Sequence, residues 1–207
     1  MKKRRISIIL LMVVMLVTVV FAGCKKKSDK DSAMEYKKGT VTDTTFESEF
    51  LNVKFTLPEN YTMVSQEEID QIMQSAAEVV YTDDKMIDYA KSVLVYEFMA
   101  KNDKNDNINI SLENLQGKKV GVDEYVEFSK KQLTNSGLPY TFDDETTKET
   151  LAGNEYTVLK AHVESNGISL DQDLYIRKIG GRMMSLIFSY QSEDELQKMK
   201  DSISPYK

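Results

Sequence analysis

Three zones with different patterns of hydrophobic and polar residues follow one another along the chain. Residues 6–22 are uncharged and almost entirely apolar, residues 25–45 are polar with few apolar side chains, and from Phe46 onward apolar positions recur with regular periods. The middle zone cannot bury enough apolar surface to offset the entropy of ordering it, so a flexible tether is predicted there. The last zone, residues 46–207, is long enough to form one globular domain.

The first half of the predicted domain changes from the period of a strand to that of a helix and back. Apolar and polar residues alternate over 46–57, which predicts a pair of strands. Ser65 and Glu68 have the spacing of a capping box, and the apolar positions after them keep helical spacing as far as Val80. The same reasoning predicts a helix at 83–91, strands at 93–101 and 108–115, and a helix at 122–135.

The last third of the chain has the pattern of a β-meander. Asn166-Gly167 is a strong hairpin signal, and Gly180-Gly181 marks a second tight turn. Because several strands carry apolar residues on both faces, we expect an α+β domain in which helices cover both faces of an antiparallel sheet, an α/β/α sandwich. The predicted elements are strands at 140–144, 147–151, 156–165, 168–178 and 182–190, and a closing helix from Ser192 to about Ile203.

Two turn-containing segments and one helix cap lead to a known family. They are Phe55-Thr56-Leu57-Pro58-Glu59-Asn60-Tyr61, the Ser65 cap, and Leu151-Ala152-Gly153-Asn154-Glu155-Tyr156. With them, residues 46–207 resemble the PsbP-like fold of photosystem II extrinsic subunits, Mog-type Ran-binding proteins and many small bacterial lipoproteins. The resemblance implies an accessory or binding role. The plant subunits act on a manganese cluster, but no residues of this chain match such a site.

The N-terminus has the order of a secretory signal peptide. Four basic residues at positions 2–5 precede the apolar stretch, and small residues end it. The sequence Phe21-Ala22-Gly23-Cys24 resembles the bacterial lipobox, apart from Phe21, where Leu, Val or Ile is usual. The resemblance implies that Ala22 and Gly23 direct cleavage before Cys24 and that Cys24 receives a diacylglyceryl group. An uncleaved N-terminal anchor, which would face the same way, is the alternative.

Lipidation of Cys24 would hold the chain on the outer, extracytoplasmic face of the cell membrane, as in the lipoproteins of Gram-positive bacteria. Burial of acyl chains contributes about 0.8 kcal/mol for each CH₂, so two chains such as palmitate anchor durably where one does not. We therefore expect a signal peptide at 1–23, a tether carrying lipidated Cys24 at 24–45, and the domain at 46–207. Cys24 is the only cysteine, which excludes an intrachain disulfide.

The charge balance limits the partners that the exported chain can have. Without residues 1–23 it has 23 basic and 33 acidic residues, a net charge of −10. Nucleic-acid binding needs a basic surface, so this class is excluded. The expected partners are the membrane, through the lipid anchor, and another protein of the envelope.

Candidate catalytic and metal-binding residues are few. His162 is the only histidine and the predicted domain has no cysteine, so a zinc site lacks its usual ligands, and His162 is interpreted as a solvent-facing strand residue. Residues 103–107 begin like a calcium loop, but Ile108 and Asn114 occupy the positions where Gly and Glu are needed. This segment is therefore predicted to be a polar hairpin tip.

A run of acidic residues leaves one cation site open as a possibility. Asp143, Asp144 and Glu145, with Asp171 and Asp173, could form a patch that holds a hard cation weakly. A solvated run of charge is the preferred interpretation.

The sequence contains no motif for catalysis or for a cofactor: it has no G-x-S-x-G elbow, P-loop or GxGxxG. We therefore expect a non-catalytic binding or accessory domain that requires no cofactor. A small-ligand or cation-binding lipoprotein is the main alternative, and an envelope enzyme that relies on Asp, Glu, Tyr or Lys is the less favoured one.

Overall fold

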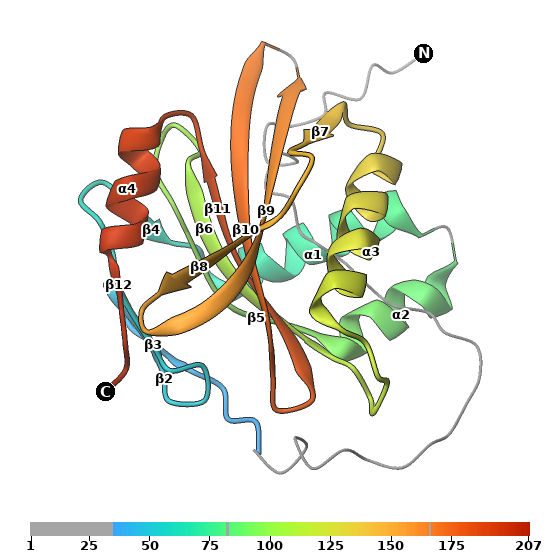
Figure 1. Ribbon diagram of the computed structural model, residues 1–207, viewed down its shortest axis with the longest axis horizontal. Helices are drawn as coiled ribbons and strands as arrows, with labels where there is room; N and C mark the ends of the chain where they lie inside the picture. The colour runs from blue at the N-terminus through green and yellow to red at the C-terminus, as the bar shows by residue number, and fades with distance from the viewer. Residues whose placement is uncertain (1–34, 82, 166) are drawn as a thin grey trace.

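The structure is a computed structural model that describes residues 35–81, 83–165 and 167–207 (Figure 1). Within these residues, all pairings between strands are antiparallel. The predicted class, α+β with antiparallel sheets, is therefore confirmed. The signal peptide, its cleavage site at Ala22 and Gly23, and Cys24 lie outside the described residues. No described helix is long and apolar enough to cross a membrane.

An eight-stranded sheet forms the centre of the molecule (Figure 1). Its strand order is β4-β5-β6-β11-β10-β9-β7, and β8 pairs with the same edge of β9 as β7 does. The register of β9 and β10 places Ser165 opposite Ile168, the pairing that the predicted hairpin requires. The strands are β4 (Thr62–Met63), β5 (Leu94–Lys101), β6 (Asn107–Asn114), β7 (Tyr140–Phe142), β8 (Thr147–Leu151), β9 (Asn154–Ser165), β10 (Ile168–Ile179) and β11 (Arg182–Tyr190).

A second, four-stranded sheet has the order β1-β2-β3-β12 and joins the two ends of the described chain. Its strands are β1 (Thr40–Val41), β2 (Thr45–Ser48), β3 (Val53–Thr56) and β12 (Ile203–Ser204). Sequence periodicity predicted β2 and β3 but neither β1 nor β12, because two-residue strands leave no measurable period. The predicted closing helix therefore ends earlier than expected, before β12.

Four helices in the described ranges follow the predicted positions closely. They are α1 (Gln66–Val80), α2 (Asp84–Val93), α3 (Val122–Asn135) and α4 (Glu193–Asp201). The Ser65 hydroxyl accepts from the Glu68 amide, as the capping box predicts. The Glu68 carboxylate, however, is bound by Lys101 of β5 instead of reaching back to Ser65.

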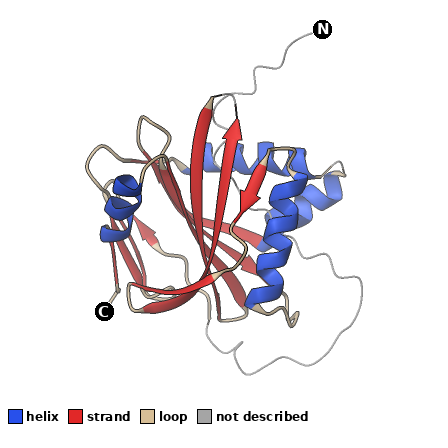
Figure 2. Ribbon diagram, turned by 45° about the horizontal axis from the view of Figure 1, so that its top comes forward, coloured by secondary structure: helices blue, strands red, loops and turns tan. Residues whose placement is uncertain are grey.

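The two faces of the large sheet are covered in different ways (Figure 2). Helices α1 to α3 lie on one face, where they form two apolar clusters with the sheet. The other face packs mainly against the four-stranded sheet, with α4 beside it. Helices therefore cover one face of the large sheet, as the expected α/β/α sandwich requires. The apolar residues of the other face are buried mainly by a second sheet, so a helical layer on that face is not shown.

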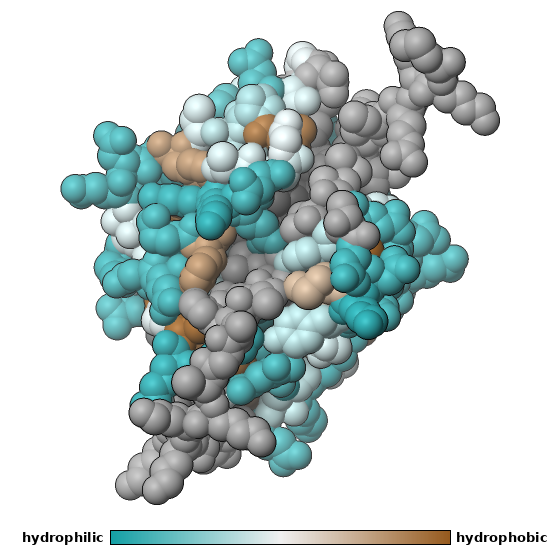
Figure 3. Space-filling model, turned by 90° about the vertical axis from the view of Figure 1, so that its right-hand side faces the viewer, coloured by the Kyte–Doolittle hydropathy of each residue, from teal (hydrophilic) through white to brown (hydrophobic). Residues whose placement is uncertain are grey.

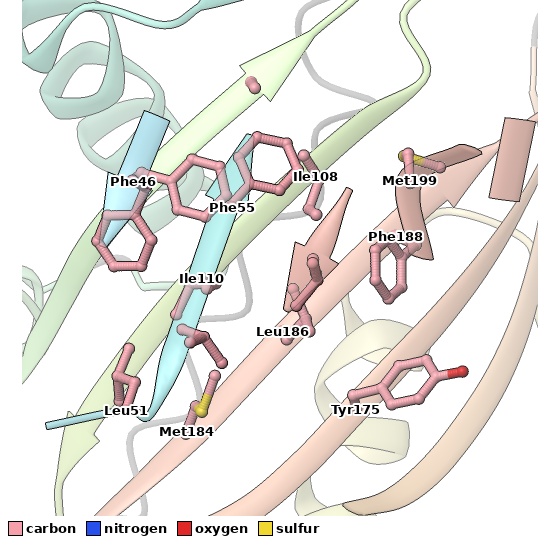
Figure 4. Close-up of a cluster of buried hydrophobic side chains, with 14 of the residues drawn as sticks. Phe46, Leu51, Phe55, Ile108, Ile110, Tyr175, Met184, Leu186, Phe188 and Met199 are labelled. Atoms are coloured by element: carbon pink, nitrogen blue, oxygen red, sulfur yellow. The ribbon is translucent and has the colours of Figure 1, made fainter. Parts of the chain in front are cut away.

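The largest apolar cluster lies between the two sheets (Figure 4). Phe46 of β2 stacks on Phe98 of β5 with ring centroids 4.7 Å apart, and Phe55 of β3 lies 4.8 Å from the same ring. Leu196 and Met199 of α4 close the cluster at the other end. The small sheet is therefore a layer of the core.

Residues 35–41 form a strap that contacts the domain, although composition assigned them to the tether. The Tyr36 hydroxyl donates to Glu97 Oε1 at 2.6 Å, and the Gly39 amide donates to Glu97 Oε2 at 2.9 Å. The Arg182 guanidinium lies 4.2 Å from the centre of the Tyr36 ring. Glu97 itself is buried at the β-bulge of β5. The chain thus leaves the domain from a fixed point on the large sheet.

Candidate functional site

A row of polar side chains lies on the helix-covered face of the large sheet. Strand β6 alternates strictly: Ile108, Ile110 and Leu112 enter the core between the sheets, and the residues between them face the helices. We call the latter set the β6 polar row; it consists of Asn107, Asn109, Ser111 and Glu113. All four are buried, with at most 4% of their surface exposed.

Polar residues of the neighbouring strands flank the β6 polar row at Ser111 and at Asn107, whereas apolar residues flank it at its centre. Ser111 lies between Tyr96 of β5 and Ser185 of β11, and Asn107 lies opposite Ser189 of β11. In the row between these two, Asn109 is flanked by Met99 of β5 and Ile187 of β11. The centre of the β6 polar row is therefore one amide between two apolar side chains.

The helices make their main contacts with the strands on either side of β6. Helix α2 packs on β5, whereas α3 packs on β7, β9 and β10. The apolar cluster of α1 and α2 reaches as far as Tyr96 and Met99, and the cluster of α3 reaches as far as Met183 and Ile187. The β6 polar row belongs to neither cluster and separates the two.

Several oxygen atoms in this region have no hydrogen-bond partner among the described residues. Among them are the side-chain oxygens of Asn107 and Asn109 and the Tyr96 hydroxyl. A buried polar group left without a partner costs about 1–3 kcal/mol. Folded proteins keep few such groups, and those they keep are commonly bound by ordered water, an ion or a ligand. Several such oxygens along one row of the sheet therefore mark a candidate binding site.

The charged end of the row is satisfied within the fold. The Tyr125 hydroxyl of α3 donates to Glu113 Oε2 at 3.1 Å. Burial, followed by the nearby Glu113 carboxylate, raises the pKa of Tyr125 well above its usual value. Tyr125 therefore stays protonated and remains a donor to Glu113 at any physiological pH.

The opposite face of the sheet carries a second group of ionisable residues, next to α4. Asp173 of β10 is 1% exposed and accepts from the Tyr190 hydroxyl at 2.9 Å. Burial raises the pKa of the Asp173 carboxyl, while Tyr190 and two lysines partly counteract it. Nearby, Tyr175 donates to Glu149 at 2.6 Å, and Lys200 of α4 lies 3.3 Å from the same oxygen.

This second group joins secondary-structure elements and does not form an open reaction centre. Burial raises the pKa of Glu149, but the bonds from Tyr175 and Lys200 outweigh it and lower that pKa overall. Glu149 therefore stays ionised and connects β8, β10 and α4. Asp173 differs because burial dominates, and its second oxygen has no hydrogen-bond partner in the described part of the chain.

His162 lies on the face that strand alternation predicted for it. It is half-exposed, and its Nδ1 lies 2.7 Å from Asp171 Oδ1 on the neighbouring strand. The acidic patch that the sequence left open as a possibility does not come together as a unit: Asp171 pairs with His162, Asp173 with Tyr190, and residues 143–145 lie between β7 and β8. No group of three or more metal-ligating residues occurs in the described ranges.

Residues 102–106 form the turn between β5 and β6, where a polar hairpin tip was predicted. Asp106, fully buried, accepts from the Gln191 backbone amide at 2.8 Å and from the Asn102 side chain at 2.8 Å. Its carboxylate therefore holds the turn against the end of β11 and leaves the calcium-loop positions without a common centre.

A surface hollow of about 410 Å³ lies where the strap meets β2 and the C-terminus. Its lining includes both signs of charge, among them Glu35, Lys37, Lys38 and Glu49. Glu49 pairs with Lys207 at 2.9 Å on the exposed surface. The hollow therefore offers no selection between anions and cations, and the β6 polar row is the stronger candidate site.

The residues of the β6 polar row were not singled out from the sequence. The available signal was the strict alternation of 107–114, Asn-Ile-Asn-Ile-Ser-Leu-Glu-Asn, in which every second residue is polar. In an isolated strand this pattern indicates a solvent-exposed face. The residues differ from ordinary exposed ones because each is at most 4% exposed, which only the tertiary structure shows.

Comparisons with known proteins leave the family open. No protein-family model matches the chain, and no curated protein sequence matches it. A solved structure described as LpqN, involved in cell envelope biogenesis of Mycobacterium tuberculosis, overlaps with a TM-score of 0.42 at 10% identity, over 73% of this chain and 82% of that one. A Bacteroides thetaiotaomicron structure overlaps with a TM-score of 0.42 at 13% identity, over 81% of this chain and 50% of that one. At these values neither similarity assigns a family or a function.

Proposed function

We propose that the chain is a lipid-anchored, extracytoplasmic binding protein without catalytic activity, and that it holds a small ligand at the β6 polar row. The observation that carries the proposal is the set of buried, unpartnered side-chain oxygens at Asn107 and Asn109, in a row that separates the apolar cluster of α1 and α2 from that of α3. Binding sites in proteins are mostly apolar with a few placed polar groups, and this region has that composition.

The proposed cellular location of the protein is inferred from its N-terminal sequence and is part of the same proposal. The lipobox-like Phe21-Ala22-Gly23-Cys24 supports cleavage before Cys24 and acylation of its sulfur, on the outer face of a Gram-positive cell membrane. The turn segments that resemble PsbP-like proteins support an accessory role in the envelope. A protein anchored in this way meets small molecules of the envelope before they reach the membrane.

A binding role agrees better with the chemistry of the site than an enzymatic one. The ionised or ionisable groups near the row, Glu113 and Tyr125, are bound to each other, and burial holds the Tyr125 pKa far above the working range of a general base. Amide and hydroxyl groups, which dominate the row, recognise ligands by hydrogen bonding and do not take up protons.

The test is thermal unfolding of the full-length protein with and without the protein-free small-molecule fraction of the cell envelope. A ligand that binds only the native state raises the melting temperature of the wild type. The variant Asn109→Leu, which removes the central amide, should lose this response. Equal responses of wild type and variant, or none in either, would show that the row is not a binding site.

A further inference from the structure

We infer that the strap, residues 35–41, is a latch on Glu97 that sets how far the domain can move away from the membrane. The inference rests on the lipid anchor at Cys24 in the proposed function and adds a conformational device to it. With the strap closed, ten residues (25–34) separate Cys24 from the domain, and with the strap open, twenty residues (25–44) do. At full extension these lengths span about 35 Å and about 70 Å.

One buried carboxylate holds the strap. Glu97 of β5 is 2% exposed, and both of its carboxylate oxygens accept from the strap. The Tyr36 hydroxyl donates to Oε1 at 2.6 Å, and the Gly39 amide donates to Oε2 at 2.9 Å. The Arg182 guanidinium of β11 lies over the Tyr36 ring, 4.2 Å from its centre. Because hydrogen bonds to an ionised acceptor are stronger than neutral ones, this contact is strong and is concentrated at one point.

The strap has one closed position. Gly39 lies so near Phe46 of β2 that a Cβ would be 2.3 Å from the ring, a close approach that requires glycine. The Tyr36 ring meets Phe50 edge to face, with the ring centroids 5.4 Å apart. These contacts position the strap against β2 and the turn after it, while Glu97 holds it to β5. The closed strap therefore fixes the point at which the chain leaves the domain.

The rest of the strap contributes little burial, so it can open while the domain stays folded. None of residues 35–41 is buried, and Tyr36 is the hydrophobic strap residue that packs against the apolar cluster between the sheets. Strand β1 is paired with β2 through two residues only. Segments near a chain end that have few buried contacts open at a lower free energy than the whole domain. Opening therefore leaves the two sheets packed and frees residues 35–44.

Hydrogen exchange of the full-length protein tests the latch. In the wild type, amides of residues 36–41 should exchange faster than those of the central strand β10, because opening the strap does not require global unfolding. The double variant Tyr36→Ala/Glu97→Gln removes both halves of the contact. It should speed strap exchange by about tenfold or more and leave β10 unchanged. Tyr36→Ala alone, which leaves the sheets unaltered, gives the same test if the double variant does not fold.

Lys37→Ala is the matched control for exchange. This exposed side chain lies in the same strap, and its removal leaves both bonds to Glu97 in place. Exchange should stay at the wild-type rate in the strap and in β10. Strap amides that exchange as slowly as those of β10, in the wild type and in the Tyr36 variants, would overturn the latch.

Neutron reflectometry measures the reach. The lipidated protein is placed on a supported bilayer of phosphatidylglycerol and phosphatidylcholine, and the distance of the protein layer from the bilayer is recorded. A flexible chain of twenty residues spans about 8 Å more than one of ten, so the layer of Tyr36→Ala/Glu97→Gln should move outward by about this amount. A ten-residue Gly-Ser insertion between Ser32 and Ala33 adds the same length with the latch intact and should give the same shift. Lys37→Ala should give none.

The outcomes separate this inference from the proposed function. A layer that moves outward with the insertion but not with the double variant would overturn the control of reach by the strap. A protein that carries no lipid would remove the anchor from the proposed function and the control of reach with it, while hydrogen exchange still decides whether the latch opens. Neither measurement involves the β6 polar row, so a failed ligand test at Asn109 leaves the latch in place.

Discussion

At the scale of single residues, burial gives several polar side chains properties that their residue type does not predict. Asp173 lies under α4 with 1% of its surface exposed, and desolvation disfavours its charged form. Asn109 lies on the opposite face with an unpartnered oxygen. Each of these buried groups lowers the free energy of unfolding, but only at Asp173 does the loss depend on pH.

The first prediction concerns Asp173→Asn. The folded-state pKa of Asp173 is raised above its ordinary value of 3.8, so the carboxyl stabilises the fold most fully below that pH and loses this contribution as the pH rises through the raised pKa. The variant lacks this dependence. Urea unfolding from acid to neutral pH should show the wild type losing stability relative to the variant, by about 1.4 kcal/mol for each unit of pKa shift.

Tyr190→Phe gives an internal check on this prediction. The Tyr190 hydroxyl donates to Asp173, which lowers the Asp173 pKa and partly offsets desolvation. Its removal should move the pH at which stability is lost to a higher value. An unchanged or lower value would mean that Asp173 is not the group being titrated.

The second prediction concerns Asn109→Leu without ligand. Replacing a buried group that lacks a partner by an apolar one of similar size is neutral or stabilising, so the free energy of unfolding should stay equal or rise by about 1 kcal/mol. Asn154→Leu is the contrast, because Asn154 is bonded to Arg177 and to the Asn52 carbonyl. It should lose about 1–3 kcal/mol in the same urea titration.

At the scale of elements, a few polar contacts fasten the small sheet and the strap to the large sheet. Arg177 of β10 donates to Asn154 Oδ1 at 2.7 Å and to the Leu51 carbonyl in the turn between β2 and β3. Glu97 holds the strap through Tyr36 and the Gly39 amide. Packing in the apolar cluster holds the two sheets together, and these directional contacts fix how the sheets are aligned.

The third prediction concerns Arg177→Met. The change removes the bond to the Leu51 carbonyl and the bond to Asn154, and it should cost about 2–3 kcal/mol of unfolding free energy, since hydrogen bonds from charged groups are stronger than neutral ones. Lys178→Met removes the same charge from the next residue, which is exposed. It should change stability by less than about 0.5 kcal/mol. Similar losses in the two variants would point to net charge as the cause.

The fourth prediction concerns Gly39→Ala. A Cβ at position 39 would lie 2.3 Å from the Phe46 ring and 2.9 Å from the Glu47 carbonyl, so the strap or the ring must move. We expect a loss of about 1–3 kcal/mol, typical of overpacking, and faster hydrogen exchange at residues 36–41. Gly121→Ala, at the N-cap of α3 with open space around its Cβ, should cost less than about 1 kcal/mol and leave strap exchange unchanged.

At the scale of the whole molecule, the described outer surface bears on the proposed attachment to a membrane. The outer surface on the helix side is mostly hydrophilic in its described residues (Figure 3). Val41 is the one large hydrophobic residue that is strongly exposed in the described ranges. The proposed attachment to the membrane rests on the lipid that Cys24 would carry.

The fifth prediction concerns Cys24→Ser. In cells fed labelled palmitate, the wild type should carry the label and remain with the membrane fraction. The variant should carry none and should either keep its signal peptide or appear in the medium, because one cysteine supplies the only thiol. Label on the Cys24→Ser protein would place the lipid elsewhere and remove the anchor from the proposal.

The sequence by itself determined the local elements of this protein. Local sequence signals depend only on neighbouring residues; they are the strand alternation, the helix caps at Ser65 and Ser192, and the hairpin signal at 166–167. The structure places strands and helices where these signals predicted them. The export signal, lipid anchor and PsbP-like resemblance are also read from local motifs, and they stay predictions because Cys24 lies outside the described residues.

Only the tertiary structure decided which elements cover which face. The apolar residues on both faces of β11 indicated two covering layers, but periodicity does not distinguish a layer of helices from one of strands. Strands of two residues, such as β1 and β12, acquire their identity from partners far away in the chain. The same holds for the candidate site: Asn107 and Asn109 have the sequence pattern of exposed residues but are 1% exposed in the fold, because burial is a property of contacts between distant segments.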